Sequence, residues 1–542
     1  MSVRTEYSWR IWLLPLVVLA GVGLTLFVFT LWMDASSAMN PARALMLLLH
    51  PNPDSAAATL SNAAEVVASV LAIAITVVAI VVELSANRYT HRITELFVSE
   101  PINFAVMGLF VITALQAVWF SLVFDSEENF QHFIPYAGIT VTMLLLTTCL
   151  LILLPYFAFV FAFLDPMRIV ERIRVHSLKA INRKPGKNVP SRQSEAVRGV
   201  EQLTDVALNA MQHKDKRISM ASIDALKDLV IDYQSTRHRL SRTWFQVEGE
   251  LAHNPDFVSL APHMLADIST RGVWLEMKVL RQYQTLFNNG LVVMRDIDYL
   301  VAINTRLIGE HAVRAGRTEL IDLCMRFFNT YIRATINKPD VRTAYNVVNQ
   351  YRLLAETMLG AGDNERVVEI ARYLKYYGQT SFSHQLPFVL ETIAYDLCNL
   401  AELAFAIEAP ARESLVRILL EVDSESETQV QEVSLRGVRK AQVKLATYFL
   451  LRDEASWARR VYEDMCGEPK ERLASIRDEL LRAETSEFWE VSDRGVNFDY
   501  LAPERRAKLA EFFSWFGELR PPHHTIALRM IDAAARPHQP KP

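Results

Sequence analysis

The residues best suited to binding chemistry form a polar and aromatic stripe in the sequence NKPDVRTAYNVVNQYR, which begins at residue 337. Helical spacing would place five of them on one face. The five are Arg342, Tyr345, Asn346, Asn349 and Arg352. The preceding helical stretch adds Asn329 and Arg333, which we expect to face the same groove. A solvated face would mainly use Glu and Lys, because Asn is a poor helix former and Tyr is rarely left in water. The stripe is therefore expected to be partly buried.

Three interpretations of this stripe are open from the sequence. In the first, amide and guanidinium groups satisfy each other between packed helices, as buried polar groups must. In the second, Arg333, Arg342 and Arg352 bind an anion or an acidic peptide, and the Asn and Tyr side chains orient it. In the third, the face is simply exposed.

Signatures of catalysis are not found in the sequence. It contains no G-x-S-x-G elbow, no glycine-rich phosphate loop and no H-E-x-x-H pair. His523 and His524 adjoin prolines near the C-terminus, and the DSESE run from Asp423 lacks the glycine and terminal glutamate of a calcium loop. We therefore predict a protein that is not an enzyme and that uses no cofactor and no metal.

Length and composition indicate two folding units of different character. A chain of 542 residues exceeds the size of a single hydrophobic core. The first 165 residues are strongly apolar, whereas the rest is charged like a soluble helical protein. A formal net charge of -4 gives no sign of a nucleic-acid partner. Four widely spaced cysteines are expected to be buried, reduced thiols, namely Cys149, Cys324, Cys398 and Cys466.

Four apolar stretches are long enough to cross a bilayer, which takes about 20 residues. They cover residues 11–33, 63–84, 102–124 and 133–164. The first is too long for the core of a signal peptide, which runs to about 15 residues. The fourth is unusually long and contains Pro155, so we expect it to bend and then to leave the membrane.

The distribution of basic residues predicts the orientation of these spans, because positive charge stays on the cytoplasmic side. Arg4 and Arg10 precede the first span, Arg88 and Arg92 follow the second, and a dense basic run follows the fourth. The two remaining loops contain only Arg43. We predict a multi-pass protein of the cytoplasmic (inner) membrane with both termini in the cytoplasm.

Polar residues inside the spans are few and uncharged at depth. Thr113, Gln116, Thr147 and Thr148 are typical of helix packing rather than of ion transport. One pore hypothesis stays open. Acidic residues at an outer mouth would gather cations in an oligomeric channel. These residues are Glu65, Glu127 and Glu128.

The segment after the fourth span, residues 166–192, is predicted to be a basic juxtamembrane helix and linker. Its apolar residues Met167, Val170, Ile173 and Ile181 fall near one face. Its basic residues are placed to contact anionic lipid headgroups. They are Arg168, Arg172, Arg174 and Lys179. A plain positive flank of a membrane span is the alternative.

The first 165 residues resemble a family of bacterial predicted membrane proteins known as domain of unknown function 2254. The resemblance is carried by WLLPLVVLAG in the first span and by VVELSANRYTHRITELFVSEPINFAVMGLFVITALQAVW across the second and third. The family usually has Ser-Pro-Arg where this sequence has YTHR, so only Arg92 is kept and the chain is a divergent member. The resemblance implies the four-span layout and no activity.

The remaining chain, residues 193–520, is predicted to be all-helical, and residues 521–542 a disordered tail. Turn sequences recur about every 45 residues, around Gly316, Gly362, Ala409 and Asp453. This spacing favours a solenoid of helix hairpins, of tetratricopeptide type, over an irregular bundle. The run FWEVSDRGVNFDYL from Phe488 departs from the pattern and is interpreted as a small hairpin or as a cap on the last helix.

Taken together, these features predict a membrane-tethered interaction or sensory module without catalysis. Its expected partners are the lipid bilayer and either another protein or a second copy of itself, giving a homo-oligomer. The alternative is an oligomeric ion channel, possibly gated by membrane tension, with a cytosolic helical domain.

Overall fold

The computed structural model describes residues 21–22, 24–33, 53–88, 94, 97–98, 100–124, 136–183, 189–423, 432–487 and 494–519. Within these ranges every regular element is a helix and no strand occurs, which confirms the predicted all-α class. The chain divides into two compact units, Met1–Ile173 and Arg174–Pro542. The predicted tail lies outside the described residues.

Unit 1 is built from the long apolar helices α3 (Pro53–Arg88), α5 (Pro101–Phe124) and α6 (Tyr136–Phe163). Each contains a stretch long and apolar enough to cross a membrane, Ser61–Ala86, Pro101–Ser121 and Ala137–Phe163. A shorter apolar helix covers Leu24–Met33. Three of the predicted spans are therefore confirmed as candidate spans. Most of the first predicted span lies outside the described residues, so a total of four stays a prediction.

The polar residues at depth in unit 1 take part in helix packing. Gln116 of α5 donates from Nε2 to the Thr30 hydroxyl, at 3.3 Å. The Thr113 hydroxyl donates to its own helix and also contacts a cysteine of α6. Thr147 and Thr148 donate to backbone carbonyls one turn earlier, each at 2.8 Å. These contacts agree with the packing role that the sequence favoured.

The long fourth apolar run ends as a helix at Phe163, and a separate helix α7 (Pro166–Asn182) begins after Asp165. Pro155 stands inside α6, where it lacks one backbone N–H for the helical ladder. Asp165 Oδ1 accepts a hydrogen bond from the Met167 amide, at 3.0 Å. This bond satisfies one of the free amides at the start of α7.

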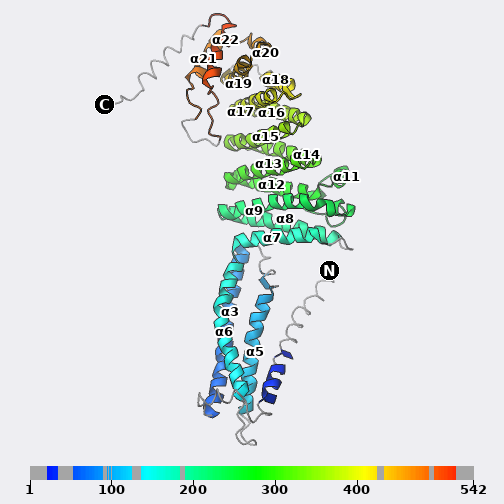
Figure 1. Ribbon diagram of the computed structural model, residues 1–542, viewed down its shortest axis with the longest axis vertical. Coiled ribbons are helices and arrows are strands. Elements are labelled where there is room, and N and C mark those ends of the chain that lie inside the picture. The colour runs from blue at the N-terminus through cyan, green and yellow to red at the C-terminus, as the bar shows by residue number, and fades with distance from the viewer. Residues whose placement is uncertain are drawn as a thin grey trace, which may run out of the picture. The chain divides into compact units, whose positions relative to one another are not determined.

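Unit 2 is an array of helices stacked one above another (Figure 1). The first half of the array contains α8 (Val189–Gln212), α9 (Lys216–Thr236), η1 (Arg237–Arg239), η2 (Arg242–Phe245), α10 (Pro255–Val258), α11 (Pro262–Arg271), α12 (Trp274–Val293) and α13 (Arg295–Arg314). The second half contains α14 (Thr318–Asn337), α15 (Val341–Gly360), α16 (Asn364–Ser383), α17 (Pro387–Ala406), α18 (Arg412–Leu420), α19 (Glu432–Leu451), α20 (Ala455–Met465), α21 (Lys470–Arg482) and α22 (Pro503–Ser514).

The helices of the array alternate between two layers. The first layer contains α9, α13, α15, α17 and α19, each packed on the next, and the second contains α8, α12, α14, α16 and α18. Helices α14 to α17 begin at residues 318, 341, 364 and 387, so a new helix starts every 23 residues. One hairpin therefore recurs every 46 residues, close to the predicted 45, and the predicted helix-hairpin array is confirmed in this part of the chain.

Several turns that join the layers share one geometry. In these turns the amide of the residue before the helix donates to a carbonyl five residues earlier, as in Arg317 N to Ala312 O at 2.8 Å and Asp363 N to Met358 O at 3.0 Å. The residue before that amide has positive φ, +64° at Gly316 and +83° at Gly362. This is the left-handed helix end that glycine favours. The same turn at Gln385 uses a non-glycine residue, with φ +63°.

Stacked aromatic rings pack between neighbouring helices of the array. Phe287 stacks on Tyr331 with ring centroids 4.7 Å apart, and Phe328 stacks on Tyr351 at 4.8 Å. All four side chains are buried. These rings link α12 to α14 within the second layer and α14 to α15 across the two layers.

Candidate docking face on the first layer

The predicted stripe lies on α15, in the first layer, and is partly buried as expected. Tyr345 and Asn346 are 9% and 6% exposed. Asn349 and Arg352 are half-buried, and Arg342 is exposed. The five residues therefore run from the interior of unit 2 to its surface.

Asn329 and Arg333 are not brought to this face. They lie on α14, which belongs to the second layer. The Arg333 guanidinium donates to the Tyr376 hydroxyl of α16, at 3.0 Å, and lies over the rings of Tyr376 and Tyr377. Successive helices alternate between layers, so side chains of α14 and α15 that would share a groove in an isolated hairpin point to different neighbours.

The stripe meets an acidic residue of the next first-layer helix. Asp396 of α17 has no exposed surface, and its Oδ1 lies 3.2 Å from Arg352 Nε. Arg352 also pairs with Glu356 and donates to Asn349 Oδ1, at 2.9 Å. Burial raises the pKa of Glu356, and the neighbouring Arg352 counteracts that effect. This part of the stripe is a polar network between packed helices, which is the first of the three interpretations.

A non-helical stretch of the chain, residues 494–500, lies against α15, α17 and α19; we call it the docked segment. Arg494 donates from Nη1 to Asp396 Oδ1 at 2.6 Å and from Nη2 to the Tyr345 carbonyl at 2.7 Å. Its guanidinium lies 4.1 Å from the centre of the Tyr345 ring. One buried carboxylate thus faces two arginines, Arg352 from α15 and Arg494 from the docked segment.

The rest of the docked segment is held by an aromatic ring and a carboxylate. Phe498 stacks on Tyr395 of α17, with ring centroids 4.7 Å apart and an angle of 11°. Asp499 accepts from the Tyr395 hydroxyl and from Lys440 Nζ of α19, each at 2.8 Å. Lys444 Nζ donates to the Phe498 carbonyl, at 2.5 Å. We name the receiving surface, made of Tyr345, Asp396, Tyr395, Lys440 and Lys444, the docking face.

The pKa values of three ionisable groups on the docking face are shifted by burial and by neighbouring charges. Burial raises the pKa of the Tyr395 hydroxyl and lowers the pKa of the Lys444 ammonium. Burial acts in the same direction on Lys440, but Asp499 and Glu479 outweigh it, so the pKa of Lys440 is raised. Lys440 therefore keeps its charge, and its contact with Asp499 is an ion pair.

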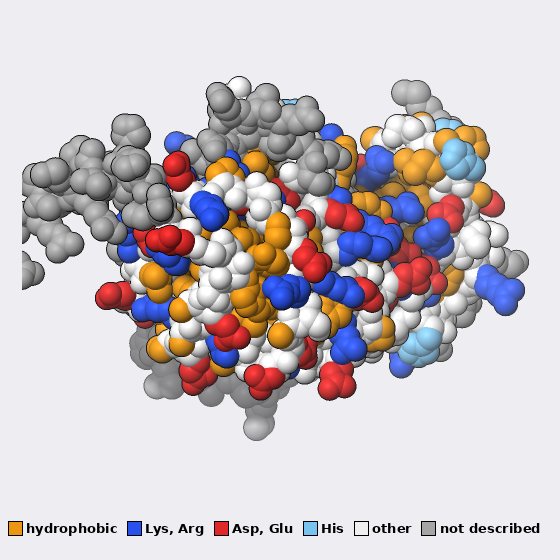
Figure 2. All heavy atoms as spheres, turned by 90° about the horizontal axis from the view of Figure 1, so that it is seen from above, with side chains coloured by type: hydrophobic (Ala, Val, Ile, Leu, Met, Phe, Trp, Pro, Cys, Tyr) orange, Lys and Arg blue, Asp and Glu red, His pale blue; other side chains and the backbone are white. Residues whose placement is uncertain are grey.

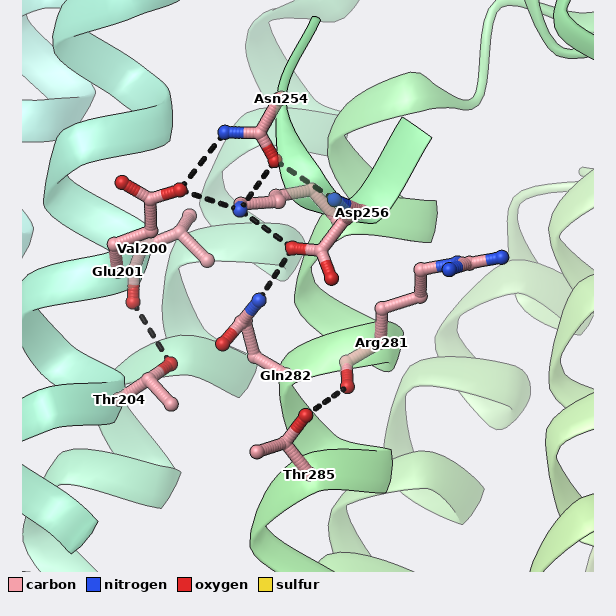
Figure 3. A network of polar contacts seen from close by, with 9 residues as sticks. Val200, Glu201, Thr204, Asn254, Asp256, Arg281, Gln282 and Thr285 are labelled. Carbon is pink, nitrogen blue, oxygen red and sulfur yellow. Dashed lines mark hydrogen bonds and ion pairs between the residues drawn. The ribbon is translucent and has the colours of Figure 1, made fainter. Parts of the chain in front are cut away.

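A second buried polar cluster surrounds Lys278 of α12. Figure 3 shows its members Glu201, Asn254, Asp256 and Gln282. Lys278 Nζ donates to Glu201 Oε1 at 2.7 Å, to Asn254 Oδ1 at 2.9 Å and to Asp256 Oδ2 at 2.5 Å. Gln282 donates to the same Asp256 oxygen. The three protons of the ammonium are all used. A cavity of about 730 Å³ adjoins this cluster, with Glu201 and Asn254 in its wall, yet the lysine has no donor left for a ligand.

The predicted headgroup residues of α7 are divided between surface and interior. Arg168 and Lys179 are exposed. Arg174 pairs with Asp232 of α9, and the Arg172 guanidinium lies 3.9 Å from the centre of the Phe163 ring. The apolar side of α7 is buried within the protein, at Ile169, Val170, Ile173, Ala180 and Ile181. Contact with lipid headgroups stays a prediction, and it concerns Arg168 and Lys179 most directly.

The structure describes only one of the three acidic residues predicted for the outer mouth of a pore. Glu65 is exposed on α3. Glu127 and Glu128 lie outside the described residues, so their relation to Glu65 stays a prediction. Among the described side chains, no group of three His, Cys, Asp or Glu is arranged to hold a metal ion. Three cysteines are buried as expected, whereas Cys466 is exposed.

Comparison with known proteins finds a family model that matches the first part of the chain. Residues 9–214 match the model of a family described as predicted membrane protein (DUF2254). The predicted resemblance is confirmed. The DUF2254 match reaches beyond the expected 165 residues and takes in α7 and α8. The chain is thus a membrane protein that resembles a family of unknown function, and the match ends before the helix hairpins that carry the docking face.

Two further comparisons add little to the DUF2254 match. A search of curated proteins found no match. One solved structure, described as a circular tandem repeat protein with novel repeat topology and enhanced subunit contact surfaces, is 13% identical. The alignment covers 87% of this chain and 98% of that one with a TM-score of 0.25. A TM-score this low does not show a shared fold.

Three residues of these clusters were not found from the sequence, namely Asp396, Arg494 and Lys278. Asp396 stands in the apolar stretch IAYDLCNLAELAF, where a carboxylate signals a buried partner. Lys278 stands in a similar setting in WLEMKVL. The sequence around Arg494 was singled out as unusual, but local pattern gives no sign of which helices it contacts.

Proposed function

We propose that the protein is a non-catalytic interaction module, tethered to the membrane by unit 1, whose docking face binds a segment of a partner protein. The observation that carries the proposal is the docked segment itself. Residues 494–500 are not helical, and the face holds them through a guanidinium, a ring and a carboxylate.

The chemistry of the docking face suits polypeptide recognition. Lys444 binds a main-chain carbonyl of the segment, and the Tyr345 carbonyl and Asp396 bind a side chain. Tyr395 combines a stacking surface with a hydroxyl donor. Sites for particular side chains supply specificity, as in other modes of peptide recognition.

The kind of partner and the cellular location of the module are also proposals. The basic flanks of the spans support a location in the cytoplasmic (inner) membrane with both termini in the cytoplasm. Figure 2 shows acidic and basic side chains mixed across the end of unit 2 that carries α20 to α22. Such a mixture, together with the net charge of -4, favours a protein partner over nucleic acid.

Photo-crosslinking of the full chain in native membranes tests the proposal. A photoreactive amino acid at Arg342, which is exposed beside the docking face, should yield a discrete crosslinked species. The same amino acid at Arg333, exposed on the second layer, should not. Replacing Asn349 by Ala together with Asp396 by Asn should remove the product formed at position 342. Equal crosslinking from both positions would contradict a role for this face.

An oligomeric channel is the competing prediction. The described part of unit 1 gives this prediction little support. The polar residues at depth in α5 bond to neighbouring helices or to their own backbone. The assembly size in detergent tests the channel, because a monomer with so few spans cannot line a pore. Conductance across a reconstituted bilayer, changed by Glu65→Lys, would favour the channel instead.

A further inference from the structure

The docked segment is attached by its side chains far more than by its main chain. Asn497 N donates to Ser486 O at 2.9 Å, linking the segment to the stretch that leads into it. Gly495 and Val496 are exposed, and Val496 keeps 53% of its surface. The contacts with the docking face come chiefly from Arg494, Phe498 and Asp499. A segment bound in this way can leave the face without unravelling a helix.

We propose that the docking face recognises a non-helical segment of a partner that carries an arginine and, four positions later, an aromatic residue followed by an acid. The chain's own residues 494–500 occupy the face as an intramolecular competitor. This inference rests on the proposed function and specifies the ligand of the same face.

The arginine is the most specific element, because three groups on the face match a planar guanidinium. Asp396 Oδ1 and the Tyr345 carbonyl accept from different nitrogens of Arg494, and the Tyr345 ring lies beneath its plane. A lysine ammonium has no second fixed donor and does not stack in this way. The site selects arginine by shape as well as by charge.

The buried carboxylate of Asp396 can accept a further hydrogen bond. Its Oδ2 is buried and accepts no hydrogen bond from the residues that the structure describes. Arg352 approaches Oδ1 only. Removing Arg494 would leave this carboxylate with one cation and a free acceptor, so an incoming guanidinium has a strongly favourable place to bind.

Tethering gives the docked segment an advantage over a partner. A segment on the same chain has an effective concentration that a free peptide reaches only at about millimolar levels. The apparent affinity for a partner falls in proportion to the fraction of molecules whose face is open. Weakening the docked segment should therefore raise affinity for a matching peptide without any change in the docking face.

The test uses the full chain in detergent and the fluorescent peptide RGVNFDYL, which copies residues 494–501. Binding is measured by fluorescence anisotropy. The double variant Arg494→Ala, Phe498→Ala should bind this peptide at least about tenfold more tightly than the wild type. Adding Asp396→Asn should abolish the gain, whereas adding Arg333→Ala, on the other layer, should leave it. The peptides KGVNFDYL and AGVNFDYL should bind about tenfold more weakly than RGVNFDYL.

The inference is overturned if the double variant keeps its helical circular dichroism but does not bind RGVNFDYL, or binds the three peptides equally. If the double variant loses its helical signal, the single variant Arg494→Lys replaces it under the same criteria. Failure of the proposed function would look different. No crosslink would form at position 342 even though the opened face binds RGVNFDYL, whereas a crosslink without peptide selectivity would refute the arginine preference alone.

Discussion

Lys278 and Asp396 are both buried charges of unit 2 whose partners lie far away in the sequence, but the partners are of different kinds. The ammonium of Lys278 is bonded by three oxygens from α8, α10 and the residue before α10. The carboxylate of Asp396 is shared between a neighbouring helix and a non-helical segment, and one of its oxygens accepts no hydrogen bond within the described chain.

The difference separates a structural cluster from a binding one. A charge whose hydrogen-bonding capacity is filled by packed elements stabilises the fold and has nothing to offer a ligand. A charge with a free acceptor and an exchangeable partner can bind the same chemical group from another molecule. Burial and ion pairing, which both residues share, do not distinguish the two roles.

The largest effect is expected from breaking the Lys278 cluster. Lys278→Ala leaves Asp256 and Glu201 without their shared cation, and loss of one member of a buried ion pair costs about 3 to 5 kcal/mol of unfolding free energy. Denaturant unfolding of the full chain in detergent measures it. Lys216→Ala, which removes an exposed pair with Asp296, is the control and should cost under about 1 kcal/mol. Similar losses for both variants would contradict the structural role.

A third buried ionisable group, Asp298 of α13, sharpens the comparison because neither of its oxygens has a hydrogen-bond partner among the described residues. Burial, and then the nearby Asp340, raise its pKa to about 9. The folded state therefore holds a proton that the unfolded state releases near the ordinary Asp value. Stability from this group is complete below about pH 4 and falls by up to about 1.4 kcal/mol per pH unit until about pH 9.

Asp298→Asn should remove that pH dependence, since the amide does not ionise. Thermal unfolding of wild type and variant at several pH values between 5 and 8 checks it. The melting temperature of the variant should rise relative to that of the wild type as the pH increases. If the two melting temperatures change in parallel with pH, Asp298 is already ionised in the folded protein.

A smaller effect on global stability is expected from Arg494→Ala. Asp396 keeps Arg352, so the free energy of unfolding should fall by about 1 to 2 kcal/mol, less than for Lys278→Ala. Hydrogen exchange should show the change locally, with faster exchange at residues 495–500 and unchanged rates in α12. Loss of protection across the whole of unit 2 would mean that the docked segment holds the array together.

The smallest effect is expected from Arg342→Ala, because this side chain is exposed on α15. The melting temperature should stay unchanged to within the equivalent of about 0.5 kcal/mol. Crosslinking at neighbouring Asn349 should nevertheless weaken if Arg342 contacts the partner. A large loss of stability would place this arginine among the structural groups.

The hairpin array could be predicted because its signals are local. Glycines at positions 316 and 362 end helices in a conformation that glycine favours, and apolar periodicity identifies the helices between them. The apolar runs of α3, α5 and α6 were equally clear. Asp363 caps α16 by accepting from the Arg366 amide, whereas Asp453 adopts the left-handed turn and α20 has no side-chain cap.

The site could be predicted only in part, because its partners are distant in the chain. The stripe on α15 was correctly expected to be partly buried. The contacts of Arg494 with Asp396 and Tyr345 span 98 and 149 residues, and no local pattern encodes them. The assignment of Asn329 and Arg333 to the same groove failed for a related reason, since a single hairpin does not show how α14 packs on α16.

The even 23-residue spacing of helix starts also limits how this protein can change in length. Deleting α16, the helix between the two that carry Tyr345 and Asp396, would move every later helix to the opposite layer and separate these two residues. Deleting or duplicating 46 residues elsewhere in the array would keep each later helix on its own side. Insertions that keep every later helix in its layer must therefore add whole hairpins. The same holds for a redesigned array.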